Sequence, residues 1–253
     1  MADIVGQPGF DILTRLLPSL INQRRPDLVI VNGENGSEGK GLTVELTRTL
    51  LEMGVDVITS GNHIWDKQPL RKELKNLPQL LRPLNYPAGS GGHGSIVVKT
   101  KSDMPVAVVN LQGRTYMTPI DCPFRTAERE IKNLAAQTRI VFVDMHAEST
   151  AEKQAFAWFL DGQASVIVGT HTHVQTADER ILPGGTGYIT DAGMTGAFDS
   201  VIGSSIKVSI QKFLTQTPQP FHLASENIRL NGVVADIDPA TGKCLRIERL
   251  NLP

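Results

Sequence analysis

The sequence predicts a layered α/β fold, because short β-branched runs alternate with helical stretches through residue 175. Each run is too short and too continuously apolar for a surface helix, and such runs are typical of central strands buried on both faces. The predicted strands are 28–31, 55–59, 106–109, 140–143 and 166–168.

Helical stretches are predicted between these strands, at about residues 10–23, 37–53, 67–77, 124–137 and 150–160. Pro18 removes an amide donor inside the first of them, so we expect this residue to kink or split that helix.

Two regions depart from the alternation. Residues 84–105 are rich in turn-forming residues, and with the segment to about 126 they predict a small cap or insertion at 84–126 within a single domain of residues 1–253. Near the C-terminus, Asn231-Gly232 and the run from Pro239 to Gly242 separate alternating runs, which predicts antiparallel strands joined by two turns.

Composition and charge exclude several classes of function. The 25 Lys and Arg residues nearly balance the 26 Asp and Glu residues, so no global field attracts nucleic acid or a membrane. Cys122 and Cys244 are the only cysteines, which excludes a disulfide framework and a zinc knuckle. No apolar run approaches the ~18 residues of a spanning helix, so we expect a soluble, cytoplasmic protein without a membrane partner.

Four of the predicted strands run directly into side chains that bind metals. Ligands of open α/β sheets collect outside the carboxyl ends of the strands, so these four loops are expected to converge on one crevice. In chain order the loops carry Glu34 with Asn35, Asn62 with His63, His146, and His171 with His173.

The types of ligand narrow the choice of metal. Imidazoles, carboxylates and an amide oxygen, without a thiolate, suit Fe, Mn, Zn or Co. Six or seven such groups exceed what a single catalytic zinc ion needs, and their number fits two ions about 3.5–4 Å apart with a bridging carboxylate. Two such cations acidify a bridging water and neutralise a phosphoryl oxyanion, which is the electrostatic problem of phosphoester hydrolysis.

Each loop also has a plain structural explanation. A single histidine after a strand is more often a capping or loop residue, and Gly-Glu-Asn at 33–35 could be ordinary turn chemistry. Four such loops in one chain are much harder to obtain from turn preferences, so together they favour a metal site. His93 and His222 are expected to lie outside that site.

A family resemblance rests on the segments Asp3-Ile-Val-Gly-Gln-Pro-Gly9, Val31-Asn-Gly-Glu-Asn35, Thr59-Ser-Gly-Asn-His63-Ile-Trp-Asp66, Leu111-Gln-Gly-Arg114, Asp121-Cys-Pro-Phe-Arg125, Val143-Asp-Met-His146-Ala-Glu148, Gly169-Thr-His-Thr-His173 and Ile189-Thr-Asp-Ala-Gly-Met-Thr-Gly196. The chain closely resembles the YmdB-like bacterial phosphoesterases, a branch of the calcineurin-like metallophosphoesterase superfamily. The resemblance runs from residue 3 to nearly the C-terminus.

The resemblance implies a four-layer α-β-β-α sandwich of two mixed sheets and a dinuclear metal centre, with iron as the most expected metal. It implies His63 as the general acid that protonates the leaving oxygen, or as an electrophilic stabiliser, and Asn35 as a group that contacts the phosphate or supports the ligands. The implied metal ligands are Asp3 and His173 for one ion, Asn62, His146 and His171 for the other, and Glu34 as the bridge between them.

The start of the chain departs from the family pattern. Family members carry a short hydrophobic strand and a glycine before the first-motif aspartate, whereas this sequence reads Met1-Ala2-Asp3. The resemblance therefore predicts that the first inner strand is missing, which would leave neighbouring backbone groups unpaired and Asp3 on a fraying terminus.

The predicted function is a metal-dependent phosphodiesterase that hydrolyses small phosphodiesters, with 2′,3′-cyclic nucleotides as the characteristic substrates of the family, by attack of a hydroxide that bridges two metal ions. Two alternatives stay open. A phosphomonoesterase of the 5′-nucleotidase or phosphatase type uses the same metal chemistry, and a regulatory binding protein linked to RNA turnover would need no hydrolysis. A partner protein from RNA turnover and a homo-oligomer are left open as well.

Overall fold

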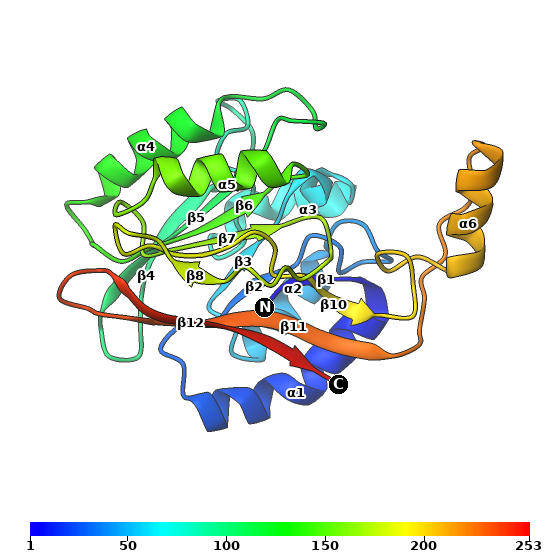
Figure 1. Cartoon of the computed structure of the whole chain (residues 1–253), viewed down its shortest axis with the longest axis horizontal. Coiled ribbons are helices and arrows are strands. Elements are labelled where there is room, and N and C mark those ends of the chain that lie inside the picture. Colours follow the sequence, from blue (N-terminus) through cyan, green and yellow to red (C-terminus); the bar gives the residue numbers. More distant parts are fainter.

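The computed structural model describes all residues, 1–253 (Figure 1). The helices are α1 Gly6–Arg24, α2 Val44–Glu52, α3 Gln68–Glu73, α4 Pro123–Leu134, α5 Thr150–Phe159 and α6 Ile206–Thr215, with the 3-10 turns η1 Asn62–Trp65 and η2 Leu74–Asn76. The strands are β1 Asp3–Ile4, β2 Ile30–Asn32, β3 Val57–Thr59, β4 Ser95–Lys99, β5 Pro105–Gln112, β6 Val141–His146, β7 Val166–Thr170, β8 Arg180–Ile181, β9 Gly187–Ile189, β10 Met194–Ala197, β11 Ile228–Ile237 and β12 Cys244–Leu252. None of the helices combines the length and the hydrophobicity that a membrane crossing requires.

Six strands form the largest sheet, in the order β4-β5-β6-β7-β9-β8. β5, β6, β7 and β9 are parallel, while β4 and β8 pair antiparallel at the two edges. The register aligns Gln112 of β5, His146 of β6 and Thr170 of β7, so three neighbouring strands end at the same place. The mixed α/β fold and the five predicted strands are confirmed, with boundaries shifted by a few residues.

The remaining strands form two further sheets, β2-β3 and β1-β10-β11-β12, where the resemblance predicted two sheets in all. The reason is the shortness of β1, which pairs with β10 over two residues only. β1 forms no ladder of hydrogen bonds with β2. Met1, which precedes β1, makes two hydrogen bonds to β2 instead: its carbonyl accepts from the Asn32 amide at 3.1 Å, and its amine donates to the Ile30 carbonyl at 2.7 Å. Two bonds do not join β2 and β10 into one continuous sheet.

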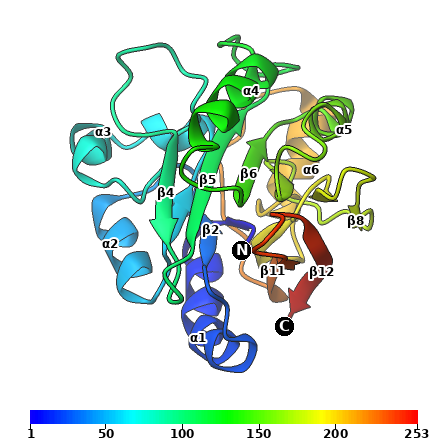
Figure 2. The same cartoon turned by 90° about the vertical axis from the view of Figure 1, so that its left-hand side faces the viewer.

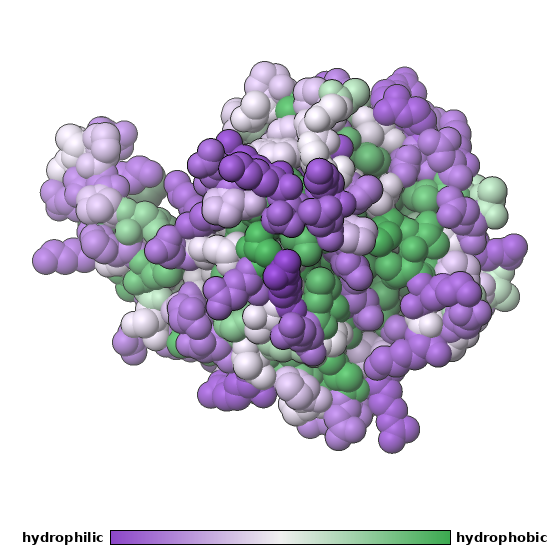
Figure 3. Space-filling model, turned by 180° about the vertical axis from the view of Figure 1, so that it is seen from behind, coloured by the Kyte–Doolittle hydropathy of each residue, from purple (hydrophilic) through white to green (hydrophobic).

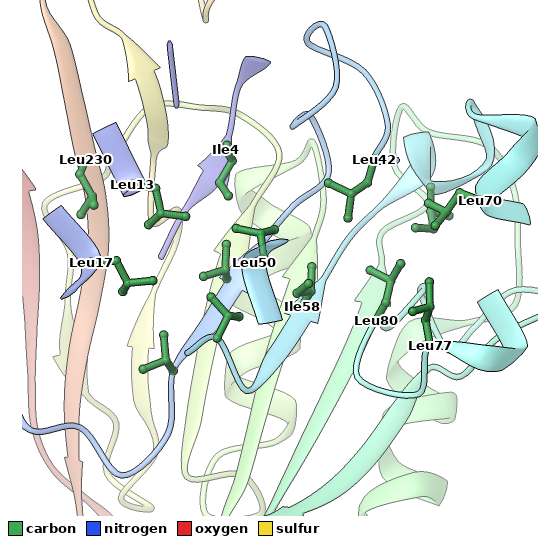
Figure 4. Close-up of a cluster of buried hydrophobic side chains, with 14 of the residues drawn as sticks. Ile4, Leu13, Leu17, Leu42, Leu50, Ile58, Leu70, Leu77, Leu80 and Leu230 are labelled. Carbon is green, nitrogen blue, oxygen red and sulfur yellow. The ribbon is translucent and has the colours of Figure 1, made fainter. Parts of the chain in front are cut away.

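The apolar core is divided among four clusters. One packs α1 and α2 against β2 and β3 (Figure 4), and a second packs α4 and α5 against β5, β6 and β7. Two smaller clusters lie between strands of different sheets, from β7 and β9 to β11 and β12, and from β5 to β2 and β3. Helices therefore cover the strands on opposite sides (Figure 2), while the predicted order of four separate layers stays a prediction.

Two helices differ from their predicted extent. The stretch 37–53 is helical only from Val44, because Glu38, Gly39 and Gly41 have positive φ angles that interrupt a right-handed helix. Thr43 then begins α2, since its hydroxyl accepts from the Leu46 amide at 3.1 Å. Pro18 lies inside α1 without splitting it.

The predicted turn at Asn231-Gly232 is wrong, because β11 runs without interruption from 228 to 237. Pairing with other strands outweighs the turn preference of this dipeptide: the Asn231 amide donates to the Thr195 hydroxyl at 3.3 Å, and its carbonyl accepts from Ala2 at 3.0 Å. The second predicted turn is confirmed, since β11 and β12 form an antiparallel hairpin around residues 238–243.

The segment 84–126, predicted as a cap or insertion, supplies β4 and β5 to the six-stranded sheet and the start of α4. Helix α6 was not predicted. It lies in the excursion between β10 and β11 and stands away from the rest of the chain (Figure 1), with hydrophobic surface exposed beside it (Figure 3). Its exposed apolar side chains are Ile206, Ile210, Phe213 and Leu214.

The predicted fraying of the first residues does not occur, because Asp3 is fully buried and Met1 is bonded to β2. The predicted absence of a first inner strand stays a prediction. A cavity of about 500 Å³ adjoins Met1, and apolar side chains line it from Leu28 and Ile30 on one side to Val233 and Ala235 on the other. Burial lowers the pKa of the Met1 amine to about 6, because the charged form of this amine is unfavourable beside an apolar cavity.

We predict that five or six β-branched residues added before Met1 stabilise the protein. They would continue β1 between β2 and β11, fill the apolar cavity and replace the buried amine by an amide. Two or three newly buried side chains at about 1.5 kcal/mol each would raise the thermal midpoint by roughly 5–10 °C. A Gly-Ser extension of equal length is the control, and equal melting temperatures of the two extended forms would contradict the prediction.

Candidate metal centre

The predicted ligands come together at the carboxyl ends of the strands. The Asp3 carboxylate accepts from the His171 amide at 3.0 Å and lies 3.9 Å from the Nε2 atom of His173. The Glu34 carboxylate lies 3.6 Å from the Nε2 atom of His146, and the Nε2 atom of His146 lies 3.1 Å from the Nδ1 atom of His171. Strands β1, β2, β6 and β7 thus deliver side chains to one place; β2, β6 and β7 are three of the four strands predicted to do so, and β1 is an addition to them.

Asn62, His63 and Asn35 border this group. Asn62 opens η1 directly after β3. The His63 amide donates to Glu34 at 2.5 Å, and its Nδ1 atom lies 2.9 Å from the Asp66 carboxylate, so the other ring nitrogen is free. The Asn35 amide donates to the Nε2 atom of His173 at 3.1 Å.

A network beneath the ligands begins at Asp144, which is buried in β6. Its carboxylate accepts from Asn32 at 2.9 Å, from Thr59 at 2.5 Å and from Thr170 at 2.7 Å. Asn32 in turn accepts from the Glu34 amide at 2.9 Å. Strands β2, β3 and β7 are therefore tied to β6 directly below the loops that carry the ligands.

Hydrogen bonds assign the tautomers of His146 and His173. Because the Thr170 hydroxyl donates to Asp144, it accepts from the Nδ1 atom of His146 at 2.9 Å. The Nδ1 atom of His173 donates to the Ile202 carbonyl at 3.0 Å.

His171 has two polar neighbours, the Nε2 atom of His146 at 3.1 Å from its Nδ1 atom and the Glu148 carboxylate at 3.1 Å from its Nε2 atom. The rings of His146 and His173 each keep an unprotonated Nε2 atom that faces another member of the cluster, which is how supporting groups prepare histidines for a metal ion.

Sequence reasoning missed these supporting groups. Glu148 stands in a motif that resembles the family, yet nothing in the sequence pairs it with His171. Thr170 looks like an ordinary strand residue, and Ile202 contributes only a backbone carbonyl. A carbonyl partner has no side-chain signal, so no sequence pattern could have identified it.

Burial shapes the electrostatics of the cluster. It raises the pKa of Asp3 well above its usual range and the pKa of Glu34 to about 8, with neighbouring carboxylates adding to the increase. Burial also lowers the pKa of His146 far below its usual range and the pKa of His171 to about 4. The imidazoles are therefore neutral, and the raised pKa values mean that the two carboxyl groups ionise readily only when a cation lies beside them.

Three buried oxygens of the cluster have no hydrogen-bond partner, namely Asp3 Oδ1, Glu34 Oε2 and Asn62 Oδ1. Buried polar atoms without a partner are rare in folded proteins and call for a ligand or an ion. The Nε2 atoms of His146 and His173, whose Nδ1 atoms donate elsewhere, add unprotonated imidazole nitrogens to these oxygens. This donor set of oxygen and imidazole nitrogen fits divalent or trivalent transition metals.

The side chains as they stand do not yet surround an ion. No three His, Cys, Asp or Glu groups gather around one point at metal-ligand distance. The rings of His146 and His171 contact each other instead, with centroids 4.8 Å apart. Metal binding would therefore need these side chains to rotate.

The comparisons with known proteins identify the family of the chain. The sequence pattern of the YmdB-like protein family matches residues 1–250. A 2′,3′-cyclic-nucleotide 2′-phosphodiesterase of Bacillus subtilis is 46% identical over 250 residues, which cover 99% of this chain and 94% of the relative.

Two solved structures have the same fold. One is a hypothetical protein of Thermus thermophilus, with a TM-score of 0.92 and 38% identity, covering 100% of this chain and 98% of that one. The other is described as a novel phosphatase of Mycoplasma pneumoniae, with a TM-score of 0.93 and 36% identity, covering 99% and 91%.

Fold, site and relatives together define an enzyme of the phosphatase and phosphodiesterase class. Within that class, the chain belongs to the YmdB-like family.

The centre also predicts a strict need for glycine at position 61. An added Cβ would lie 2.1 Å from the His146 ring, which is itself fully buried. We therefore expect Gly61→Ala to displace His146 and to cost about 1–3 kcal/mol of unfolding free energy, measured by chemical denaturation. Gly91→Ala is the matched control, since no atom lies closer than 3.9 Å there. If the two variants unfold alike, the close contact between residues 61 and 146 is not real.

Proposed function

We propose that this protein is a metal-dependent phosphodiesterase whose centre holds two metal ions. The observation that supports this function best is the set of three buried oxygens without partners, which lies among neutral imidazoles at the ends of five strands. Because burial raises the pKa of Asp3 and Glu34, their ionised forms need a cation beside them, and two bound metal ions would supply it. The preferred metal is iron, with manganese, zinc or cobalt as the alternatives.

The pairwise contacts suggest how the ligands divide. Asp3 and His173 approach each other and would hold one ion, while His146 and His171 approach each other and would hold the second with Asn62. Glu34 has one oxygen toward His146 and another without a partner, which suits a bridging carboxylate. Both ions would then share the charge of Glu34.

The chemistry divides between the ions and the side chains. When bound, the cations supply an acidified water and neutralise charge that develops on the phosphoryl oxygens. His63 would protonate the leaving oxygen, because Asp66 holds its Nδ1 atom and leaves the other ring nitrogen available. Asn35, next to His173, would contact the phosphate or orient that imidazole.

The Bacillus subtilis relative acts, by its name, on 2′,3′-cyclic nucleotides. We infer the same class of substrate here, with a small cyclic phosphodiester in contact with both ions. A phosphomonoesterase is the main alternative, and faster hydrolysis of p-nitrophenyl phosphate than of bis(p-nitrophenyl) phosphate would favour it. A regulatory binding protein linked to RNA turnover would keep its cellular role after the ligands are removed. A cytoplasmic location, a partner protein and a homo-oligomer stay predictions.

Glu34→Gln tests the bridge. The substitution keeps the shape of the side chain but removes the charge that brings two cations together, so we expect metal content to fall and hydrolysis of bis(p-nitrophenyl) phosphate to collapse. Elemental analysis of anaerobically purified protein measures the first effect and steady-state kinetics the second. If metal content and kcat both stay within about threefold of the parent, a change under ~1 kcal/mol, Glu34 is not a bridge.

His63→Ala separates metal binding from proton transfer. The backbone amide that donates to Glu34 remains in this variant, so both ions should stay bound. We expect kcat to fall by roughly 10²–10⁴-fold, the usual contribution of a positioned acid or base. His146→Ala is the comparison, since it should lose metal as well as rate. Equal loss of metal in both variants would make His63 a ligand instead.

A further inference from the structure

A buried ion pair lies behind the candidate metal centre. The ammonium group of Lys153, on α5, lies 2.7 Å from the carboxylate of Asp191, which follows β9. Lys153 is 1% exposed and Asp191 is not exposed at all. Lysine is almost never buried to this degree unless it is paired, and a buried pair costs desolvation energy on both sides. Neither residue belongs to the predicted ligand set.

Asp191 also binds the residue between the two histidines of the last ligand loop. Its Oδ2 atom accepts from the Thr172 amide at 3.1 Å and from the Thr172 hydroxyl at 2.6 Å, besides Lys153. Its backbone is joined to Thr176, whose hydroxyl accepts from the Asp191 amide at 2.9 Å. One residue thus holds both ends of the loop 172–176.

This loop has an unfavourable backbone conformation at both histidines. His171 has a φ of 97° and His173 a φ of 64°, and non-glycine residues in such regions cost on the order of 1–3 kcal/mol each. Such conformations persist only where the surroundings enforce them. Thr172 lies between the two histidines, and its two hydrogen bonds to Asp191 hold the backbone there in place.

Gly169 leaves room for this arrangement. A Cβ at this position would lie 2.9 Å from the Lys153 side chain and 1.7 Å from the Thr190 carbonyl oxygen. Because residue 169 of the Gly169-Thr-His-Thr-His173 motif has no side chain, the Lys153 side chain can extend from α5 past β7 to Asp191. The motif and the ion pair are parts of one structure.

We propose that Lys153 and Asp191 are positioning residues that act through Thr172 to hold His171 and His173 in the geometry for metal binding. This inference rests on the proposed metal centre. Lys153 pairs with the same Asp191 oxygen that accepts both hydrogen bonds from Thr172, and so holds this carboxylate in place. The competing explanation is that the pair stabilises the fold without any effect on the loop.

Thr172→Val and Thr172→Ser separate the two explanations. Valine keeps the shape but loses the hydroxyl that donates to Asp191, whereas serine retains it. In the metal-stripped full-length chain we expect valine to weaken Mn²⁺ binding by about 10–100-fold in a calorimetric titration, the usual effect of a lost supporting contact. Serine should stay within about threefold of the parent.

Thr47→Val is the control, because Thr47, fully buried where Thr172 is half-buried, loses a hydroxyl bond to the Thr43 carbonyl within α2. It should leave Mn²⁺ affinity unchanged even where it lowers the thermal midpoint. Normal affinity in Thr172→Val, or an equal loss in Thr47→Val, would overturn the inference.

Lys153→Met and Asp191→Asn complete the test. Lys153→Met leaves Asp191 buried without a cation, so we expect a larger loss of Mn²⁺ affinity than in Thr172→Val. The double variant restores neutrality and should bind Mn²⁺ more tightly than Lys153→Met alone. A double variant no better than this single variant would contradict the role of the pair.

Hydrogen exchange of the metal-free chain gives a readout that needs no metal. Thr172→Val should speed amide exchange at 171–176 and leave α2 unchanged, whereas Thr47→Val should do the reverse. Failure of the parent to bind Mn²⁺ would refute the proposed centre, while unchanged exchange at 171–176 in Thr172→Val would refute the positioning role alone.

Discussion

The candidate centre depends first on the buried carboxylate of Asp144. It stands in β6 and receives hydrogen bonds from β2, β3 and β7, two of which belong to a different sheet. Asn32 also accepts a hydrogen bond from the Glu34 amide, and Thr170 also accepts one from the His146 ring. One acceptor therefore sets the carboxyl ends of strands from two sheets at a fixed distance, and the ligand loops start from those ends.

Charge explains why the centre is so closely supported. Asp3, Glu34, Asp144 and Asp191 are all buried near one another, and their mutual repulsion raises the pKa of Asp3 beyond the effect of burial itself. Lys153 is the only buried cationic side chain paired with this group. Such an arrangement is costly in an apolar interior and becomes favourable only when cations share it. The buried carboxyl groups and the neutral imidazoles therefore both favour the binding of metal ions.

The beginning of the chain shows how one strand can serve both the sheet and the site. β1 pairs with β10 over two residues, yet this is enough to bury Asp3 against His171. The position of Asp3 is set by hydrogen bonds on both sides, from Met1 to β2 and from Ala2 to Asn231. The apolar cavity beside Met1 affects the stability of the strand region more than the placement of the ligand, because the contacts of Asp3 lie on the other side of Met1.

The sequence by itself determined the fold class, the central strands and the set of candidate ligands. Continuous β-branched runs are specific to buried strands, and side chains that follow parallel strands must meet at one end of a sheet. The break of the second helix before Val44, the uninterrupted β11 and the separation into three sheets were decided by tertiary structure. Each depends on contacts distant in sequence, such as Asn231 with Ala2 and Thr195, which local preferences cannot contain. The same reason explains why Glu148, Ile202, Lys153 and Asp191 could not be recognised as supports of the centre. Their role exists only because folding brings them to the histidines, whereas the histidines have metal-binding chemistry of their own.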